Sequence, residues 1–162
     1  MLQIKVAVEL ASLKARSSAP QLSFAQALHT AARLGVEAVE IDGRNEVAVA
    51  DLSRTGVRQV RKMLEDLNLR VSALSYRTRR GYSDVNELDR RIDATKRAMK
   101  LAYELGTNVV VNHIGRVPAD EDVNALSTLR TALADLGREG QRVGAMLAAE
   151  TGTESGADLL KL

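Results

Sequence analysis

The sequence contains no cysteine and no tryptophan, and its only aromatic residues are one phenylalanine and three tyrosines. Without cysteine no disulfide can form, which favours a reducing compartment and predicts a cytoplasmic protein. Proteins that bind single-stranded nucleic acid stack bases on aromatic side chains, so the shortage of aromatics argues against a nucleic-acid partner. No apolar run approaches the ~20 residues that a membrane helix needs, so no membrane partner is expected. The first residues show neither the charged region nor the cleavage site of a secretory signal.

The sequence does contain a repeated pattern of apolar stretches that end in polar residues. The five stretches are Val6–Val8 before Glu9, Ala38–Ile41 before Asp42, Val71–Leu74 before Ser75 and Tyr76, Val109–Val111 before Asn112 and His113, and Met146–Ala149 before Glu150. Segments with helical periodicity separate them, and helix-ending signals stand at Gly35, Asn68, Gly106 and Gly144. These signals are 33, 38 and 38 residues apart. Such a spacing predicts a tandem repeat of strand–helix units.

Alternating strands and helices predict an α/β fold with a parallel sheet, and repeats of this length are typical of a (β/α)₈ barrel. The 162 residues hold about five of the eight strands of such a barrel, so we expect one domain over 1–162 that forms an incomplete barrel. The first strand is expected over 4–10. An open, doubly wound sheet has the same order of elements. Its dinucleotide-binding version is disfavoured, because no Gly-x-Gly-x-x-Gly follows the first strand.

Barrel enzymes carry their chemistry at the carboxyl ends of the strands, so the polar residues at these positions are the candidates for function. Glu150 directly follows an apolar strand, where a carboxylate can bind a divalent metal or act as a base. It could equally cap the next helix or pair with an arginine of a neighbouring loop. His113 follows the strand before it and can bind a metal or contact a substrate hydroxyl, although a single histidine is more often structural.

Other strand ends supply further candidates for substrate binding. Glu40 and Asp42 share one face of their strand and either point into the barrel mouth or bond the neighbouring loop. Glu9 closes the first strand. Tyr76 and Arg77 close the third strand, and the Arg77 guanidinium could hold a phosphate or a carboxylate.

Four pieces of the sequence together resemble a known family. They are Leu34–Glu40, Leu105–Val111, His113–Gly115 and Ala148–Gly152. Their order and spacing resemble the amino-terminal part of the xylose isomerase-like TIM barrels, the sugar phosphate isomerase and epimerase group that also includes endonuclease IV. The resemblance covers essentially the whole chain.

This resemblance implies roles for individual residues. Glu150 matches a glutamate that ligates a divalent metal (Mn²⁺, Mg²⁺ or Zn²⁺) and that acts as acid or base in many isomerases. His113 matches a histidine that contacts substrate, or binds zinc in the endonuclease branch. Glu40, Tyr76 and Arg77 are expected to join His113 in binding a small sugar or sugar phosphate. The other three metal ligands of the family come from strands six to eight. This chain would therefore supply one of the four ligands, and by itself it is expected to hold no metal.

The expected function is therefore that of part of a metal-dependent sugar isomerase or epimerase, inactive until a longer chain or a partner completes it. Two alternatives stay open. The chain could be a non-catalytic half-barrel that forms a homodimer through its open strand edges. It could also belong to an endonuclease IV-like phosphodiesterase. The third strand, however, ends in Ser75-Tyr76-Arg77 and lacks the metal-binding histidine of that branch. The loop after Glu150 likewise departs from the ketose epimerase pattern of an asparagine and a second glutamate.

Overall fold

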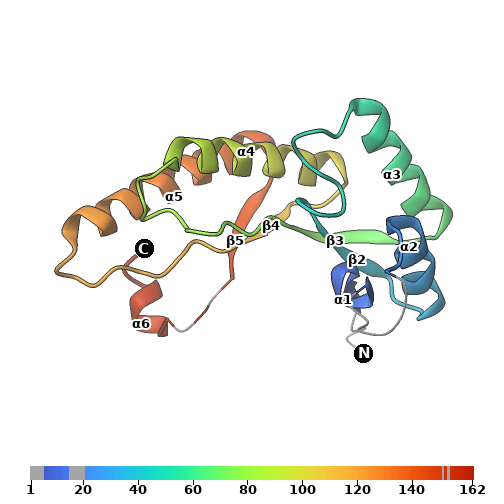
Figure 1. The fold of residues 1–162 in the computed structure, drawn as a ribbon, viewed down its shortest axis with the longest axis horizontal. Helices are drawn as coiled ribbons and strands as arrows, with labels where there is room; N and C mark the ends of the chain where they lie inside the picture. Colours follow the sequence, from blue (N-terminus) through green and yellow to red (C-terminus); the bar gives the residue numbers. More distant parts are fainter. Residues whose placement is uncertain (1–5, 15–20, 151, 153) are drawn as a thin grey trace.

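The computed structural model describes residues 6–14, 21–150, 152 and 154–162, and its centre is a five-stranded parallel sheet (Figure 1). The strands are β1 (Ala7–Glu9), β2 (Ala38–Asp42), β3 (Arg70–Ser75), β4 (Val109–Asn112) and β5 (Met146–Ala149). They lie side by side in the order in which they occur in the sequence. A doubly wound sheet reverses its strand order at one point, so this sequential order confirms successive units of an incomplete barrel instead.

The helices are α1 (Leu10–Lys14), α2 (Phe24–Arg33), α3 (Arg54–Asp66), α4 (Leu88–Glu104), α5 (Val123–Val143) and α6 (Gly156–Leu159). The four longer helices end within two residues of the predicted helix-ending signals at Gly35, Asn68, Gly106 and Gly144, whereas the short helix α1 was not predicted. The Ser23 and Ser53 side chains cap α2 and α3 by accepting backbone N–H groups in the first turn. Gly144 ends α5 in the left-handed conformation that glycine adopts without a Cβ clash. In the described part of the chain, none of these helices combines the length and hydrophobicity that a membrane span requires.

The first strand is shorter than predicted. β1 ends at Glu9, and Leu10 begins the short helix α1, whereas the strand was expected to run over 4–10. Residues 4 and 5 lie outside the described part of the chain. Leu10 is fully buried in the core. A short apolar run does not by itself distinguish a strand from a buried helical turn, which explains the wrong boundary.

The two faces of the sheet differ in burial. On one face, Val39, Ile41, Leu74 and Val110 are completely buried and form the centre of the hydrophobic core. Figure 1 shows α3, α4 and α5 grouped on one side of the strands. The opposite face is more open, and Met146 on the edge strand β5 is 57% exposed. Because side chains alternate between faces along a strand, the sequence positions next to the buried ones belong to the open face.

Candidate active site

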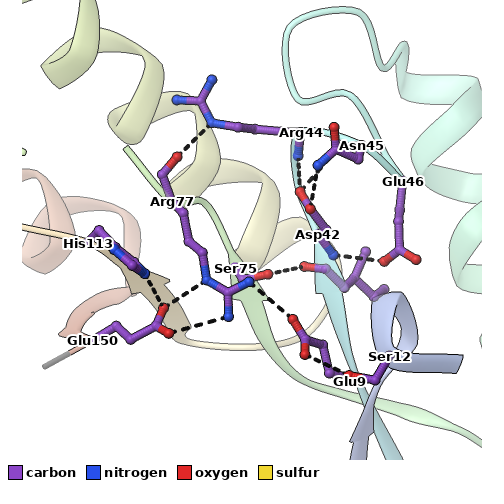
Figure 2. A network of polar contacts seen from close by, with 11 residues as sticks. Glu9, Ser12, Asp42, Arg44, Asn45, Glu46, Ser75, Arg77, His113 and Glu150 are labelled. Atoms are coloured by element: carbon purple, nitrogen blue, oxygen red, sulfur yellow. Dashed lines mark hydrogen bonds and ion pairs between the residues drawn. The ribbon is translucent and has the colours of Figure 1, made fainter. Parts of the chain in front are cut away.

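The centre of the candidate site is the side chain of Arg77, which follows the middle strand β3. Its Nε donates to Glu150 Oε2 at 2.8 Å, and its Nη2 lies 3.5 Å from Glu150 Oε1. On the other side, its Nη1 donates to Glu9 Oε1 at 3.2 Å. Figure 2 shows the guanidinium between the two carboxylates, one from each edge of the sheet. Arg77 therefore joins the carboxyl ends of β1 and β5 across the open face.

His113 completes the cluster from the end of β4. Its Nε2 lies 2.9 Å from Glu150 Oε2, the same oxygen that accepts from Arg77 (Figure 2). The side chains of Arg77, His113 and Glu150 are between 35% and 48% exposed, so solvent and small ligands can reach them. The structure thus brings three predicted residues together at the predicted end of the sheet.

The charges within the cluster reinforce one another. The hydrogen bond from Arg77 is the main cause that lowers the pKa of Glu150, and the positive charge of Arg77 and the proximity of His113 act in the same direction. The hydrogen bond to Glu150 in turn raises the pKa of Arg77, assisted by Glu9. Both partners are therefore charged at neutral pH. Because the pair is partly exposed to water, its net contribution to folding stability is on the order of 1 kcal/mol.

Glu40 supplies a further carboxylate beside this cluster. It pairs in register with Glu9 on the neighbouring strand and is half-buried. Burial is the main cause that raises its pKa, and the negative charge of Glu9 adds to it. Ser75 and Arg77 offset part of this effect. Glu40 is thus a carboxylate that retains its proton to a higher pH than Glu150 does.

Two other predicted positions lie outside the cluster. Tyr76 is part of the hydrophobic core and only 8% exposed, and the Arg44 guanidinium stacks 4.3 Å from the centre of its ring. Its role in substrate binding stays a prediction. The carboxylate of Asp42 accepts hydrogen bonds from the backbone N–H groups of Arg44 and Asn45, at 2.7 and 3.1 Å. Asp42 was expected either to point into the barrel mouth or to bond the neighbouring loop. These hydrogen bonds to the loop confirm the second interpretation.

The loops that follow β3 and β4 contact each other close to Arg77 and His113 in sequence. Gly81, in the loop after β3, packs directly on Gly115, in the loop after β4, and both have positive φ angles, +63° and +88°. Next to this contact between the two glycines, the backbone N–H of Tyr82 donates to the carbonyl oxygen of Ile114 at 2.9 Å. Any Cβ at Gly81 would overlap this carbonyl and the backbone of Gly115. The close approach of the two chains therefore requires glycine.

Glu9 received no role of its own in the sequence analysis beyond closing the first strand, yet it is a direct partner of Arg77. Its second oxygen accepts a hydrogen bond from the Ser12 hydroxyl at 2.9 Å. The signal that could have identified it was present, since Glu9 stands at a strand end like the other candidates. The sequence does not show, however, which arginine lies next to which carboxylate.

A divalent metal does not fit the described residues as they are arranged. Within 6–14, 21–150, 152 and 154–162, no group of three or more histidine, cysteine, aspartate or glutamate side chains is placed to hold one. Both oxygens of Glu150 already face donor groups of Arg77 and His113. A metal ion needs several oxygen or nitrogen ligands with free lone pairs. The donors given by this part of the chain are too few, and they are engaged with each other.

The fold and the cluster define a class of protein. Sequential parallel β/α units with ionisable side chains gathered at the carboxyl ends of the strands are the architecture of part of a (β/α)₈ barrel. The family model for the xylose isomerase-like TIM barrel matches residues 28–161. The chain therefore belongs to this family, which confirms the resemblance found in the sequence. No curated protein sequence matches the chain.

Several solved structures have the same fold as this chain. A xylose isomerase domain protein from Planctomyces limnophilus superposes with a TM-score of 0.75 at 19% identity, over 98% of this chain and 56% of its own. A D-tagatose 3-epimerase-like protein also gives 0.75, at 16% identity, over 98% of this chain and 59% of its own. A xylose isomerase-like TIM barrel protein from Mycobacterium smegmatis, solved in complex with magnesium, gives 0.69 at 18% identity, over 91% and 55%. The chain thus spans little more than half the length of these relatives.

Proposed function

We propose that this chain is part of a sugar isomerase or epimerase in which Glu150 transfers a proton on a hydroxy-carbonyl substrate. The observation that carries the proposal is the placement of Glu150 between Arg77 and His113 at the carboxyl end of a parallel sheet. Family membership and the fold likeness to a D-tagatose 3-epimerase-like protein support the same class of substrate. The completed protein, rather than the 162 residues alone, is proposed to be active.

The chemistry follows from the protonation states of the cluster. Glu150 is ionised at neutral pH, because Arg77 and His113 lower its pKa, so it is able to accept a proton from a substrate carbon. His113 is exposed enough to hydrogen-bond a substrate hydroxyl. Glu40 and Arg77 lie on the same open face and are proposed to contact other hydroxyls of a sugar. Tyr76, whose ring stacks against the Arg44 guanidinium, stays a proposed substrate-binding residue.

The proposed metal role of Glu150 depends on further ligands. A relative from Mycobacterium smegmatis was solved with magnesium, and in the family Glu150 would be one ligand for Mn²⁺, Mg²⁺ or Zn²⁺. The remaining ligands would come from outside the described residues. When bound, such an ion would polarise the carbonyl group of the substrate. The roles given above to Glu150, His113 and Arg77 do not depend on it.

Glu150→Gln tests this function. In a protein that contains this segment within a complete barrel, we expect the turnover of ketose substrates in Mn²⁺ or Mg²⁺ to fall at least about a hundredfold, since an amide cannot accept the proton. The measurement is steady-state isomerase or epimerase activity, together with a circular dichroism spectrum to show unchanged folding. Retention of full activity in Glu150→Gln would refute the assignment.

Glu37→Gln is the matched control for Glu150→Gln. Glu37 is exposed and stands just before β2, at the opposite end of the sheet from the cluster. The same change of carboxylate to amide at this position should leave turnover within about twofold, because surface changes away from functional sites have small effects. A comparable loss in both variants would point to a general effect of charge rather than to a catalytic role of Glu150.

Self-association stays a second proposal, supported by the edges of the sheet. In the described residues, β1 and β5 each pair with one neighbouring strand only, and unpaired edges favour contact with another chain. Light scattering at micromolar concentration tests it, and a monomer would contradict it. The endonuclease alternative stays a prediction and has no support from the cluster. Damaged-DNA binding with a steep salt dependence would revive it.

A further inference from the structure

We propose that Thr78 is a positioning residue of this site. Its hydroxyl holds the backbone of His113 beside that of Arg77, so that the side chains of both residues reach Glu150. The inference rests on the proposed function only in taking Glu150 as the reacting carboxylate. Its test follows the contact between Arg77 and Glu150 and requires no turnover.

The backbone pairing of β3 with β4 ends before the two residues that contact Glu150. The last hydrogen bond of this pairing runs from the Tyr76 N–H to the carbonyl oxygen of Val111, at 2.8 Å. Among the described residues, the next backbone hydrogen bond between the two segments is the one from Tyr82 to Ile114. The stretch between these two bonds contains the arginine and the histidine of the cluster. Backbone pairing alone therefore does not fix their separation.

Two side chains join the segments within this stretch, and their hydrogen bonds run in opposite directions. The Thr78 hydroxyl, one position after Arg77, donates to the carbonyl oxygen of His113. The amide nitrogen of Asn112, one position before His113, donates to the carbonyl oxygen of Tyr76. Both Thr78 and Asn112 are buried, and a hydrogen bond inside a protein is stronger than one in water. The two bonds thus bracket the arginine and the histidine.

The alternation of burial separates holding from contact. Thr78 and Asn112 are buried, whereas their neighbours Arg77 and His113 are exposed. Successive side chains of an extended chain point to opposite faces. The Thr78 hydroxyl therefore lies on the core side, away from the open face, and it acts on the site through the backbone of His113.

The contacts on Glu150 depend on this spacing. Arg77 Nε and His113 Nε2 lie 2.8 and 2.9 Å from the same oxygen, Oε2, so a shift between the two backbones disturbs the shared contact (Figure 2). On its other side the backbone of Arg77 is already tied, because its carbonyl oxygen accepts from Arg44 Nε at 2.8 Å. The bond from Thr78 is the corresponding tie toward β4. A role in stability alone predicts a different result: loss of the hydroxyl would weaken the fold and leave the contact between Arg77 and Glu150 unchanged.

The experiment follows the Nε–H proton of Arg77 by NMR in the 162-residue chain at pH 6, where its exchange with water measures how often the hydrogen bond to Glu150 opens. The signal is identified by its loss in Arg77→Lys. In Thr78→Val, which has a similar shape but no hydroxyl, we expect exchange about two- to fivefold faster, the range expected for loosening a partly exposed ion pair. Thr78→Ser keeps the hydroxyl and should restore the original rate. Equal rates in Thr78→Val and the unsubstituted chain overturn the proposal, and so does a Thr78→Ser variant that exchanges as fast as Thr78→Val.

Thr107→Val is the matched control. Thr107 is also buried, and its hydroxyl donates to the carbonyl oxygen of Ser72, again 35 positions away, but it stands before β4 at the opposite end of the sheet from the cluster. Its loss should leave the exchange rate unchanged, and an equal acceleration in both variants would overturn the proposal. If Thr78→Val does not fold by circular dichroism, Thr78→Ala replaces it with the same expected result. Faster exchange in Thr78→Val, together with full activity of Glu150→Gln in a completed barrel, would contradict the proposed function and leave this inference intact.

Discussion

Gly81→Ala is expected to lower the free energy of unfolding by about 3 kcal/mol or more. The residue has a φ of +63°, a conformation that costs a residue with a Cβ about 1–2 kcal/mol. In addition, the new methyl group would overlap the carbonyl oxygen of Ile114 and the backbone of Gly115, and forced overlaps of this kind cost about 1–3 kcal/mol. Neither partner is the end of a flexible side chain, so the two loops have to separate. The measurement is urea denaturation.

Gly106→Ala is the matched control for this prediction. Gly106 also has a positive φ, +86°, but an added Cβ meets no atom within 4 Å. Its substitution therefore measures the cost of the backbone conformation alone, about 1–2 kcal/mol. The difference in free energy of unfolding between the two variants therefore measures the cost of forcing apart the loops that meet at Gly81 and Gly115. If Gly81→Ala destabilises no more than Gly106→Ala, the two loops are not in close contact in solution.

The substitution Asn112→Asp is expected to destabilise the protein by about 3–5 kcal/mol at pH 7.5. Asn112 is fully buried, and its amide nitrogen donates to the carbonyl oxygen of Tyr76. The other polar atom of its side chain, Oδ1, has no hydrogen-bond partner among the described residues. An ionised aspartate would place an acceptor against the Tyr76 carbonyl and bury an uncompensated charge.

The pH dependence identifies the cause of this loss. Burial raises the pKa of a carboxyl group in the folded state above its unfolded value of about 3.9. Such a group contributes its stability below the unfolded pKa and loses it as pH rises through the folded pKa. The deficit of Asn112→Asp relative to the unsubstituted chain should therefore be smaller at pH 5 than at pH 7.5. Urea denaturation at the two pH values measures it.

Asn112→Leu separates the charge from the lost hydrogen bond. Leucine has a similar shape and no charge, and it leaves the Tyr76 carbonyl without its donor, at a cost of about 1–3 kcal/mol. Its deficit should be the same at both pH values. An Asn112→Asp variant with an equally constant deficit would show that the side chain at this position is not buried from solvent.

The two buried positions, Tyr76 and Asn112, show how the alternation of side chains divides the ends of β3 and β4 between the core and the open face. Each immediately precedes a residue of the cluster, Arg77 and His113. Neighbouring residues in an extended chain point to opposite faces, so Tyr76 and Arg77 cannot both reach the open face. The alternation was visible in the sequence. Applied strictly, it would have placed Tyr76 and Asn112 in the core.

The sequence by itself determined the repeated strand–helix units, their parallel order and the end of the sheet at which Arg77, His113 and Glu150 stand. These features follow from local periodicity and from helix-ending residues such as Gly144, which act over short stretches of chain. Only the tertiary structure decided that Glu9 and Glu150, from the two edge strands, share the guanidinium of Arg77. Contacts between residues about 70 positions apart depend on the curvature and register of the whole sheet, which no local pattern encodes.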